Sequence, residues 1–139
     1  MRIADGTSCF FTITRIDTDT NGRGDVNAKV SAAGLGFTGA NRSVWFDRLA
    51  INAFIADLRA LDISREGSAI LDSMSPGECT LTFSNYDLLG HLQLEVVIAR
   101  AVFFFGETDH FQSRIRFQVN SDVVAFGNLV NELEAELSV

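Results

Sequence analysis

Apolar and polar positions alternate along much of the second half of the chain. A period of two is typical of antiparallel strands that have one face in the core and one in water. Three segments show it clearly: residues 79–84, 92–96 and 115–119. A short apolar run at 69–71 predicts one more strand, which ends before the turn at 75–77. Two N-terminal runs, 9–16 and 26–32, alternate or are rich in β-branched and aromatic residues, and they predict a hairpin.

Two other segments have the period of an α-helix. The first runs from a Ser43 cap to about Leu61, with apolar residues recurring every three or four positions on one face. The second begins at a Ser121 cap, where Asp122 complements the helix dipole. The run at 102–105 breaks the alternation of the strands, and we expect its aromatic rings to be buried. These elements predict an α+β fold, in which an antiparallel β-sheet packs with two helices in the order β-β-α-β-β-β-β-α.

The composition indicates one globular domain over residues 1–139. A chain of this length buries a substantial core without disulfides or metals, and 47% hydrophobic against 21% charged residues excludes the disordered class. Cys9 and Cys79 are isolated and lack CxxC spacing, so we expect buried thiols. No segment approaches the roughly 20 apolar residues that cross a bilayer, and Met1 is not followed by the apolar region of a signal peptide. We therefore expect a cytoplasmic protein without a membrane span.

The segment 17–25 matches half of a calcium-binding loop. Its candidate ligands are Asp17, Asp19, Asn21 and Asp25. The first three are spaced two residues apart before Gly22, as in an EF-hand, but the position of the closing glutamate is occupied by Ala28. The flanks have the pattern of strands, and Asn-Gly between strands is a strong signal for a hairpin turn. We favour an acidic hairpin tip, with a calcium site on the hairpin as the alternative.

No catalytic signature is recognisable in the sequence. His91 and His110 are predicted on the exposed side of a strand and in a turn, so neither a two-histidine metal face nor a Ser/His/Asp triad has a local pattern. The glycines of 34–39 match a dinucleotide-binding fingerprint in letters only, because no helix opens there. A bulged strand or loop accounts for them better. We predict a protein that is not an enzyme and has no cofactor, with a ligand role for His110 beside Asp109 as a lesser alternative.

The acidic balance of the chain points to a protein partner. With 18 acidic and 11 basic residues the net charge is −7, which disfavours nucleic acid and speeds association with basic proteins. Three glutamates near the end of the second helix lie where the helix dipole disfavours negative charge, and they predict an exposed acidic patch. The predicted contact residues are Trp45, Asp109, Glu132, Glu134 and Glu136. A merely solvated helix face is the alternative explanation of the glutamates.

The order of the elements also suggests a family. The segments that carry this similarity are Trp45-Phe46, residues 54–61, Gly67 before Ile70-Leu71, residues 81–83, 90–96, and 117–119 followed by the C-terminal helix. In this order and apolar pattern the chain resembles the WapI immunity family of small bacterial proteins. The resemblance implies a non-enzymatic protein that neutralises a cognate toxin, with a basic toxin domain as its partner. A ligand- or calcium-binding module that uses the 17–25 loop, or an interaction domain of another kind, stays open.

Overall fold

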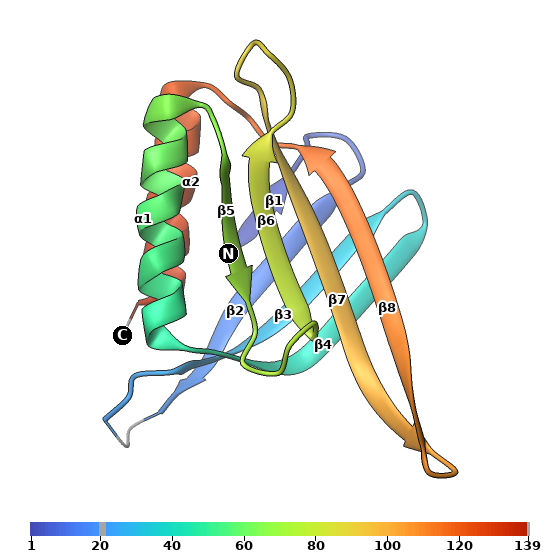
Figure 1. The fold of residues 1–139 in the computed structure, drawn as a ribbon. Helices are drawn as coiled ribbons and strands as arrows, with labels where there is room; N and C mark the ends of the chain where they lie inside the picture. The colour runs from blue at the N-terminus through green and yellow to red at the C-terminus, as the bar shows by residue number, and fades with distance from the viewer. Residues whose placement is uncertain (20–21, 139) are drawn as a thin grey trace.

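The computed structural model describes residues 1–19 and 22–138, with their side chains except those of 102–104 and 108–110. Two antiparallel sheets of four strands each and two helices confirm the predicted α+β class (Figure 1). The first half comprises β1 (Arg2–Ala4), β2 (Phe10–Thr18), β3 (Val26–Gly34), β4 (Phe37–Phe46) and α1 (Arg48–Ser64). The second half comprises β5 (Ser68–Asp72), β6 (Cys79–Asn85), β7 (Leu92–Phe104), β8 (Glu107–Gln118) and α2 (Val123–Leu137). In each sheet the strands lie side by side in the order of the sequence.

The predicted order β-β-α-β-β-β-β-α is incomplete, because β1 and β4 also precede the first helix. The predicted helix start at Ser43 is wrong. Val44 and Phe46 are buried whereas Trp45 between them is partly exposed, so this segment has the period of a strand. Helix α1 begins instead after Asp47, whose carboxylate accepts a hydrogen bond at 3.0 Å from the amide three residues further on.

The start of α2 and one connection also differ from the prediction, whereas the predicted β2–β3 hairpin is confirmed. Asp122, not Ser121, caps α2, and the Ser121 hydroxyl accepts a hydrogen bond from the Leu92 amide at 2.7 Å. Residues 107–110, predicted as a turn, form the first part of β8. The hairpin of β2 and β3 is present, and residues 19–25 connect its strands. At residues 107–110 the local turn signal gives way to strand pairing with β7.

The two halves of the chain repeat the order ββββα and match in detail. In each half the last two strands are joined by a two-residue turn, Leu35-Gly36 in the first and Phe105-Gly106 in the second. The φ angles are 53° and 84° in the first turn and 49° and 82° in the second, and positive φ at both residues is typical of type I′ hairpin turns. Phe105 is 96% exposed, contrary to the burial predicted for 102–105; the other side chains of that run lie outside the described residues.

The glycines of residues 34–39 serve a turn and a close contact between the sheets. A Cβ added to Gly34 would lie 2.6 Å from Cδ1 of Ile115, and one added to Gly39 would lie 2.3 Å from Cβ of Ser113. Both neighbours belong to β8, so the absence of side chains at these two positions lets the β3–β4 hairpin approach the second sheet. Gly36 takes the positive φ of the turn. The prediction of a strand or loop in place of a nucleotide fingerprint agrees with this geometry.

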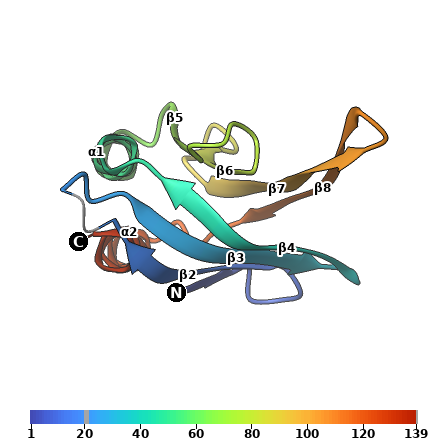
Figure 2. The same cartoon turned by 90° about the horizontal axis from the view of Figure 1, so that it is seen from below.

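Helix contacts tie the two halves together. Helix α1 lies against β5 and α2 reaches β2, so each helix contacts the sheet of the other half, and the helices lie side by side (Figure 1 and Figure 2). The ring of Phe83 in β6 contacts Phe54 from α1 and Phe126 from α2, with centroid distances of 6.1 and 6.0 Å. The buried apolar side chains of both halves form one cluster, in which these three rings are fully buried. Neither sheet is therefore covered by its own helix alone.

Candidate functional site

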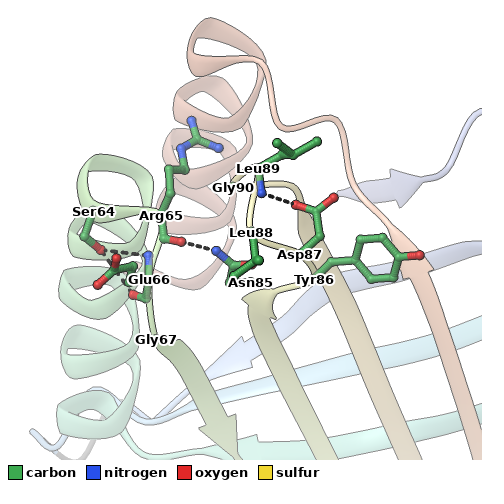
Figure 3. A pocket seen from close by; sticks show the side chains of 10 residues that line it. All are labelled: Ser64, Arg65, Glu66, Gly67, Asn85, Tyr86, Asp87, Leu88, Leu89 and Gly90. Atoms are coloured by element: carbon green, nitrogen blue, oxygen red, sulfur yellow. Dashed lines mark hydrogen bonds between the residues drawn. The ribbon is translucent and has the colours of Figure 1, made fainter.

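An open hollow of about 730 Å³ lies between the end of α1 and the loop that joins β6 to β7 (Figure 3). Residues 64–67 line it from the step between α1 and β5, and residues 85–90 line it from the β6–β7 loop. A second hollow of about 420 Å³ extends to the start of α2 and shares Arg65, Leu89 and Gly90 with the first. Three segments that are far apart in the sequence thus build one concave surface.

Arg65 joins these three segments. It ends α1 in the left-handed conformation, with φ 56°, at a position where glycine is usual. Its guanidinium donates to the Asp62 carboxylate and to the Ser121 carbonyl, both at 2.9 Å, and lies 5.6 Å from the centre of the Phe126 ring. Its own carbonyl accepts a hydrogen bond from the side chain of Asn85. These contacts offset a backbone strain of about 1–2 kcal/mol and fix one wall of the hollow.

Asp87 holds the β6–β7 loop in shape. Its carboxylate accepts hydrogen bonds from the amides of Leu89 and His91 at 2.9 and 3.2 Å, and from Nδ1 of His91 at 2.6 Å. The hydrogen bond from the His91 side chain is the largest effect on the pKa of Asp87, which lies below its ordinary value. The Tyr86 amide donates to the His91 carbonyl at 2.7 Å and closes the base of the loop. The loop is therefore an organised turn with an ionised carboxylate at its centre.

This turn carries exposed apolar side chains. Leu88 is fully exposed, Leu89 is 82% exposed and Tyr86 is 54% exposed. Val123, the first residue of α2 and part of the second hollow, is also exposed. Figure 3 shows Tyr86 and Leu89 extending from the loop in different directions. We call the set Tyr86, Leu88, Leu89 and Val123 the apolar end; grouped exposed apolar residues of this kind mark interaction surfaces.

Carboxylates surround the apolar end. Glu66 and Asp87 line the first hollow, and Asp122 lines the second. Asp62 lies beside them in its ion pair with Arg65. Glu66 is exposed and makes no ion pair with any described residue. The charge around the apolar end is thus negative, in keeping with the chain as a whole.

Asp87, His91 and Ser121 are the residue types of a hydrolase triad, but their hydrogen bonds differ from one. Ser121 lines the second hollow together with His91. Its hydroxyl donates to the Val119 carbonyl at 3.1 Å and accepts from the Leu92 amide at 2.7 Å. A nucleophilic serine donates its proton to the histidine instead. These groups hold the loop and the start of α2 in place.

The predicted calcium ligands lie on β2 and in the loop that follows it. Asp17 is in β2, where its carboxylate accepts a hydrogen bond from the next amide at 2.7 Å. Asp25 is buried and accepts a hydrogen bond at 3.2 Å from the Arg48 amide, at the first residue of α1. The Asp19 amide donates to the Asp25 carbonyl at 2.8 Å, and Asn21 lies outside the described residues. Within the described ranges no group of three or more His, Cys, Asp or Glu side chains could hold a metal ion.

The acidic residues predicted for partner binding are partly engaged within the chain. Glu134 forms an ion pair with Arg59 of α1. Glu136 accepts hydrogen bonds from the Arg15 amide at 2.8 Å and from the N-terminal ammonium group at 3.0 Å. Burial raises the pKa of Glu136, but these hydrogen bonds and charges together lower it below its ordinary value. The two glutamates therefore hold α2 against α1 and β2.

The other predicted contact residues lie apart from the apolar end. Glu132 is exposed and has no ion pair among the residues that the structure describes. Trp45 is 36% exposed on β4, and its carbonyl accepts a hydrogen bond from the Met74 amide at 2.8 Å. The side chains of Asp109 and His110 lie outside the described residues.

Leu88 and Leu89 were not among the residues that the sequence marked for binding. Their signal is an apolar pair between Asp87 and Gly90, in a segment whose composition predicts a turn. Turn residues are usually polar or small, because their side chains face water. An apolar pair at such a position is the sequence signal that could have marked this loop as a candidate interaction surface.

The comparisons with known proteins leave the family open. No protein-family model, curated protein or solved structure matches the chain. None of the helices in the described part of the chain has the length and apolar character needed to cross a membrane.

Proposed function

We propose that this chain is a non-enzymatic protein-binding module of the immunity type, which acts in the cytoplasm. It neutralises a basic toxin domain by covering the surface through which the toxin acts. In this proposal the apolar end and the hollow beside it receive the partner. The mechanism is occlusion, so the chain needs no catalytic group and no cofactor.

The observation that carries the proposal is the exposure of Leu88 and Leu89 on an organised turn. A flexible loop could fold its leucines back onto the protein, but the hydrogen bonds to Asp87 hold this loop open. Burying exposed apolar side chains in an interface removes their surface from water, which favours association. Tyr86 adds an aromatic side chain with a polar tip, a residue type enriched in such contacts.

The surrounding carboxylates support a basic partner. Asp62, Glu66, Asp87 and Asp122 lie around the apolar end, and Arg65 is already paired with Asp62. Opposite charge around an apolar contact raises the association rate and orients the partner before contact. Nucleic acid is disfavoured, because a negative surface repels phosphates.

Genetic selection tests this function without knowledge of the partner. A library of genomic fragments from the native host is introduced into cells that do or do not produce this chain. We expect fragments that are lethal alone and tolerated when the chain is present, and their products should bind the purified chain more tightly at low salt than at high salt. If no fragment depends on the chain for survival, the immunity function is wrong.

Matched variants then locate the binding surface. The double substitution Leu88→Asp and Leu89→Asp should abolish protection while leaving the melting temperature unchanged, because both side chains are exposed. The control is Leu49→Asp, which changes another exposed leucine at the opposite end of α1. If the double variant protects as well as the control, the partner binds elsewhere, and the acidic set Glu132, Glu134 and Glu136 becomes the surface to examine.

A further inference from the structure

Strand β8 is a long sheet edge. It pairs with β7 on one side and has no neighbouring strand on the other among the described residues. The other edges are shorter: β1 has three residues, β5 has five residues and lies against α1, and β4 has 10 residues. With 12 residues, β8 therefore offers the longest run of backbone groups that could pair with an added strand.

A groove of about 220 Å³ lies beside this edge. Cys9, Ala32 and Ile115 line it together with Leu35 and Phe37 of the β3–β4 hairpin. Leu35 is 80% exposed and Phe37 is 81% exposed. The groove is thus an apolar slot that runs next to unpaired strand backbone.

The charged residues that line the groove are arginines. Arg114 and Arg116 of β8 contribute to it, and no carboxylate is among its described lining residues. Arg116 pairs with Glu95 on β7, whereas Arg114 has no ion pair in the described part of the structure. In a chain with a net charge of −7, this is a local reversal of charge.

Leu35 is an unusual choice for its backbone position. Its φ of 53° lies in the left-handed region, where a type I′ turn favours Asn or Gly and a bulky side chain is strained. The strain comes in addition to an exposed apolar surface. Phe105 has the same conformation and exposure in the second half, so Leu35 is distinguished by its place beside the groove.

We propose that this groove binds an extended acidic peptide segment of a partner, which adds to β8 as a further strand and places an apolar side chain between Leu35 and Phe37. Main-chain hydrogen bonds to β8 supply affinity. The slot selects an apolar residue, and Arg114, which has no ion pair among the described residues, selects acidic residues beside it. The surface is separate from the apolar end, and the proposal does not rest on the toxin-binding function.

Arginines on an edge strand also protect it from pairing with other chains. Protection alone leaves Leu35 and Phe37 unexplained, because exposed apolar residues beside an edge favour pairing. The combination of an open edge, an apolar slot and cationic side chains fits an acidic strand better than it fits a guarded edge. A second copy of this chain is the competing occupant, but its own β8 would bring arginines against arginines.

The test uses the full chain and fluorescein-labelled peptides. The first peptide alternates glutamate with valine, the second replaces each glutamate by lysine, and the third is the first with every second amide methylated on nitrogen. We expect the first to bind, with at least tenfold weaker binding of the second and third in fluorescence anisotropy. Equal binding of all three peptides, or no binding of the first, overturns the proposal. Analytical sedimentation gives a second test: a concentration-dependent dimer that the first peptide does not dissociate also overturns it.

A pair of variants separates binding from folding. Leu35→Asn creates an Asn-Gly turn, and we expect a higher melting temperature together with at least fivefold weaker binding of the acidic peptide. The matched control is Phe105→Asn, which makes the same change in the equivalent turn of the second half. It should raise the melting temperature and leave peptide binding unchanged. If Leu35→Asn stabilises the chain without weakening binding, the slot does not hold the peptide. A separate variant, Arg114→Glu, should reverse the charge preference, so that the lysine peptide binds more tightly than the glutamate peptide.

Discussion

Asp25 offers the sharpest test of what the loop between β2 and β3 does. Its side chain is buried, and its Oδ1 accepts a hydrogen bond at 3.2 Å from the amide of Arg48, the first residue of α1. Helix N-termini carry free amides and a partial positive charge, so a carboxylate there stabilises the helix. Substitution Asp25→Ala removes this acceptor and leaves the Arg48 amide without it.

The magnitude follows from two effects. Loss of a side chain that caps a helix costs about 0.5–2 kcal/mol, and an amide left unsatisfied away from water costs about 1–3 kcal/mol. We expect a loss of about 2 kcal/mol, which at this chain length lowers the melting temperature by roughly 6–8 °C. Asp25→Asn keeps an oxygen acceptor and removes only the charge, so its cost should stay below about 1 kcal/mol.

Urea unfolding followed by far-ultraviolet circular dichroism measures both variants. The order wild type, Asp25→Asn, Asp25→Ala in decreasing stability supports a capping role. Equal stability of wild type and Asp25→Ala would refute it. Calcium at millimolar concentration provides the second arm: if Asp25 serves α1, the melting temperature does not change, whereas a specific calcium site must raise it by mass action.

Three further predictions follow from other contacts. At neutral pH a thiol reagent should label Cys9 and spare Cys79, because burial, together with the charge of Asp72, raises the pKa of Cys79 to about 12; rapid labelling of a Cys9→Ser variant would contradict this. Gly39→Ala should lower the free energy of unfolding by about 1–3 kcal/mol through overpacking against Ser113, and the added substitution Ser113→Gly should restore most of it. Because the pKa of Asp87 is lowered in the folded state, its contribution to stability is present above the ordinary carboxyl pKa and is lost as pH falls through the lowered value. Urea titrations between about pH 5 and 2 should therefore show a smaller loss of stability for Asp87→Asn than for wild type, and identical profiles would exclude the role of this carboxylate.

The period-two and helical patterns of apolar residues predict most of the strands and both helices. The strands β5, β6 and β7 and both helices are recognisable because their apolar residues lie on one buried face. Strand β4 could not be recognised, because the spacing between Val44 and Ile51 fits the apolar face of a helix, although Val44 lies on the buried face of a strand. Only pairing with β3, a contact between distant positions, decides between them.

The candidate site was harder to predict than the fold. Glu134 and Glu136 looked like a free acidic patch, but their partners Arg59 and Arg15 are 75 and 121 residues away in the sequence. Conversely, the leucines of the β6–β7 loop looked like ordinary linker residues. They are exposed on a turn in which Asp87 accepts hydrogen bonds from the amides of Leu89 and His91. Both errors arise because ion pairs and exposure are set by tertiary contacts that periodicity does not encode.

The exchange of helix contacts between the halves has a consequence for synthesis on the ribosome. When the first ββββα unit leaves the exit tunnel, α1 has neither β5 nor α2 to lie against, and β2 lacks the contact that α2 provides. The nascent unit therefore exposes apolar surface until α2 has emerged, and stable folding of the first unit waits for that helix. A ribosome that pauses in the second half would present an unfinished chain to chaperones rather than a folded first half.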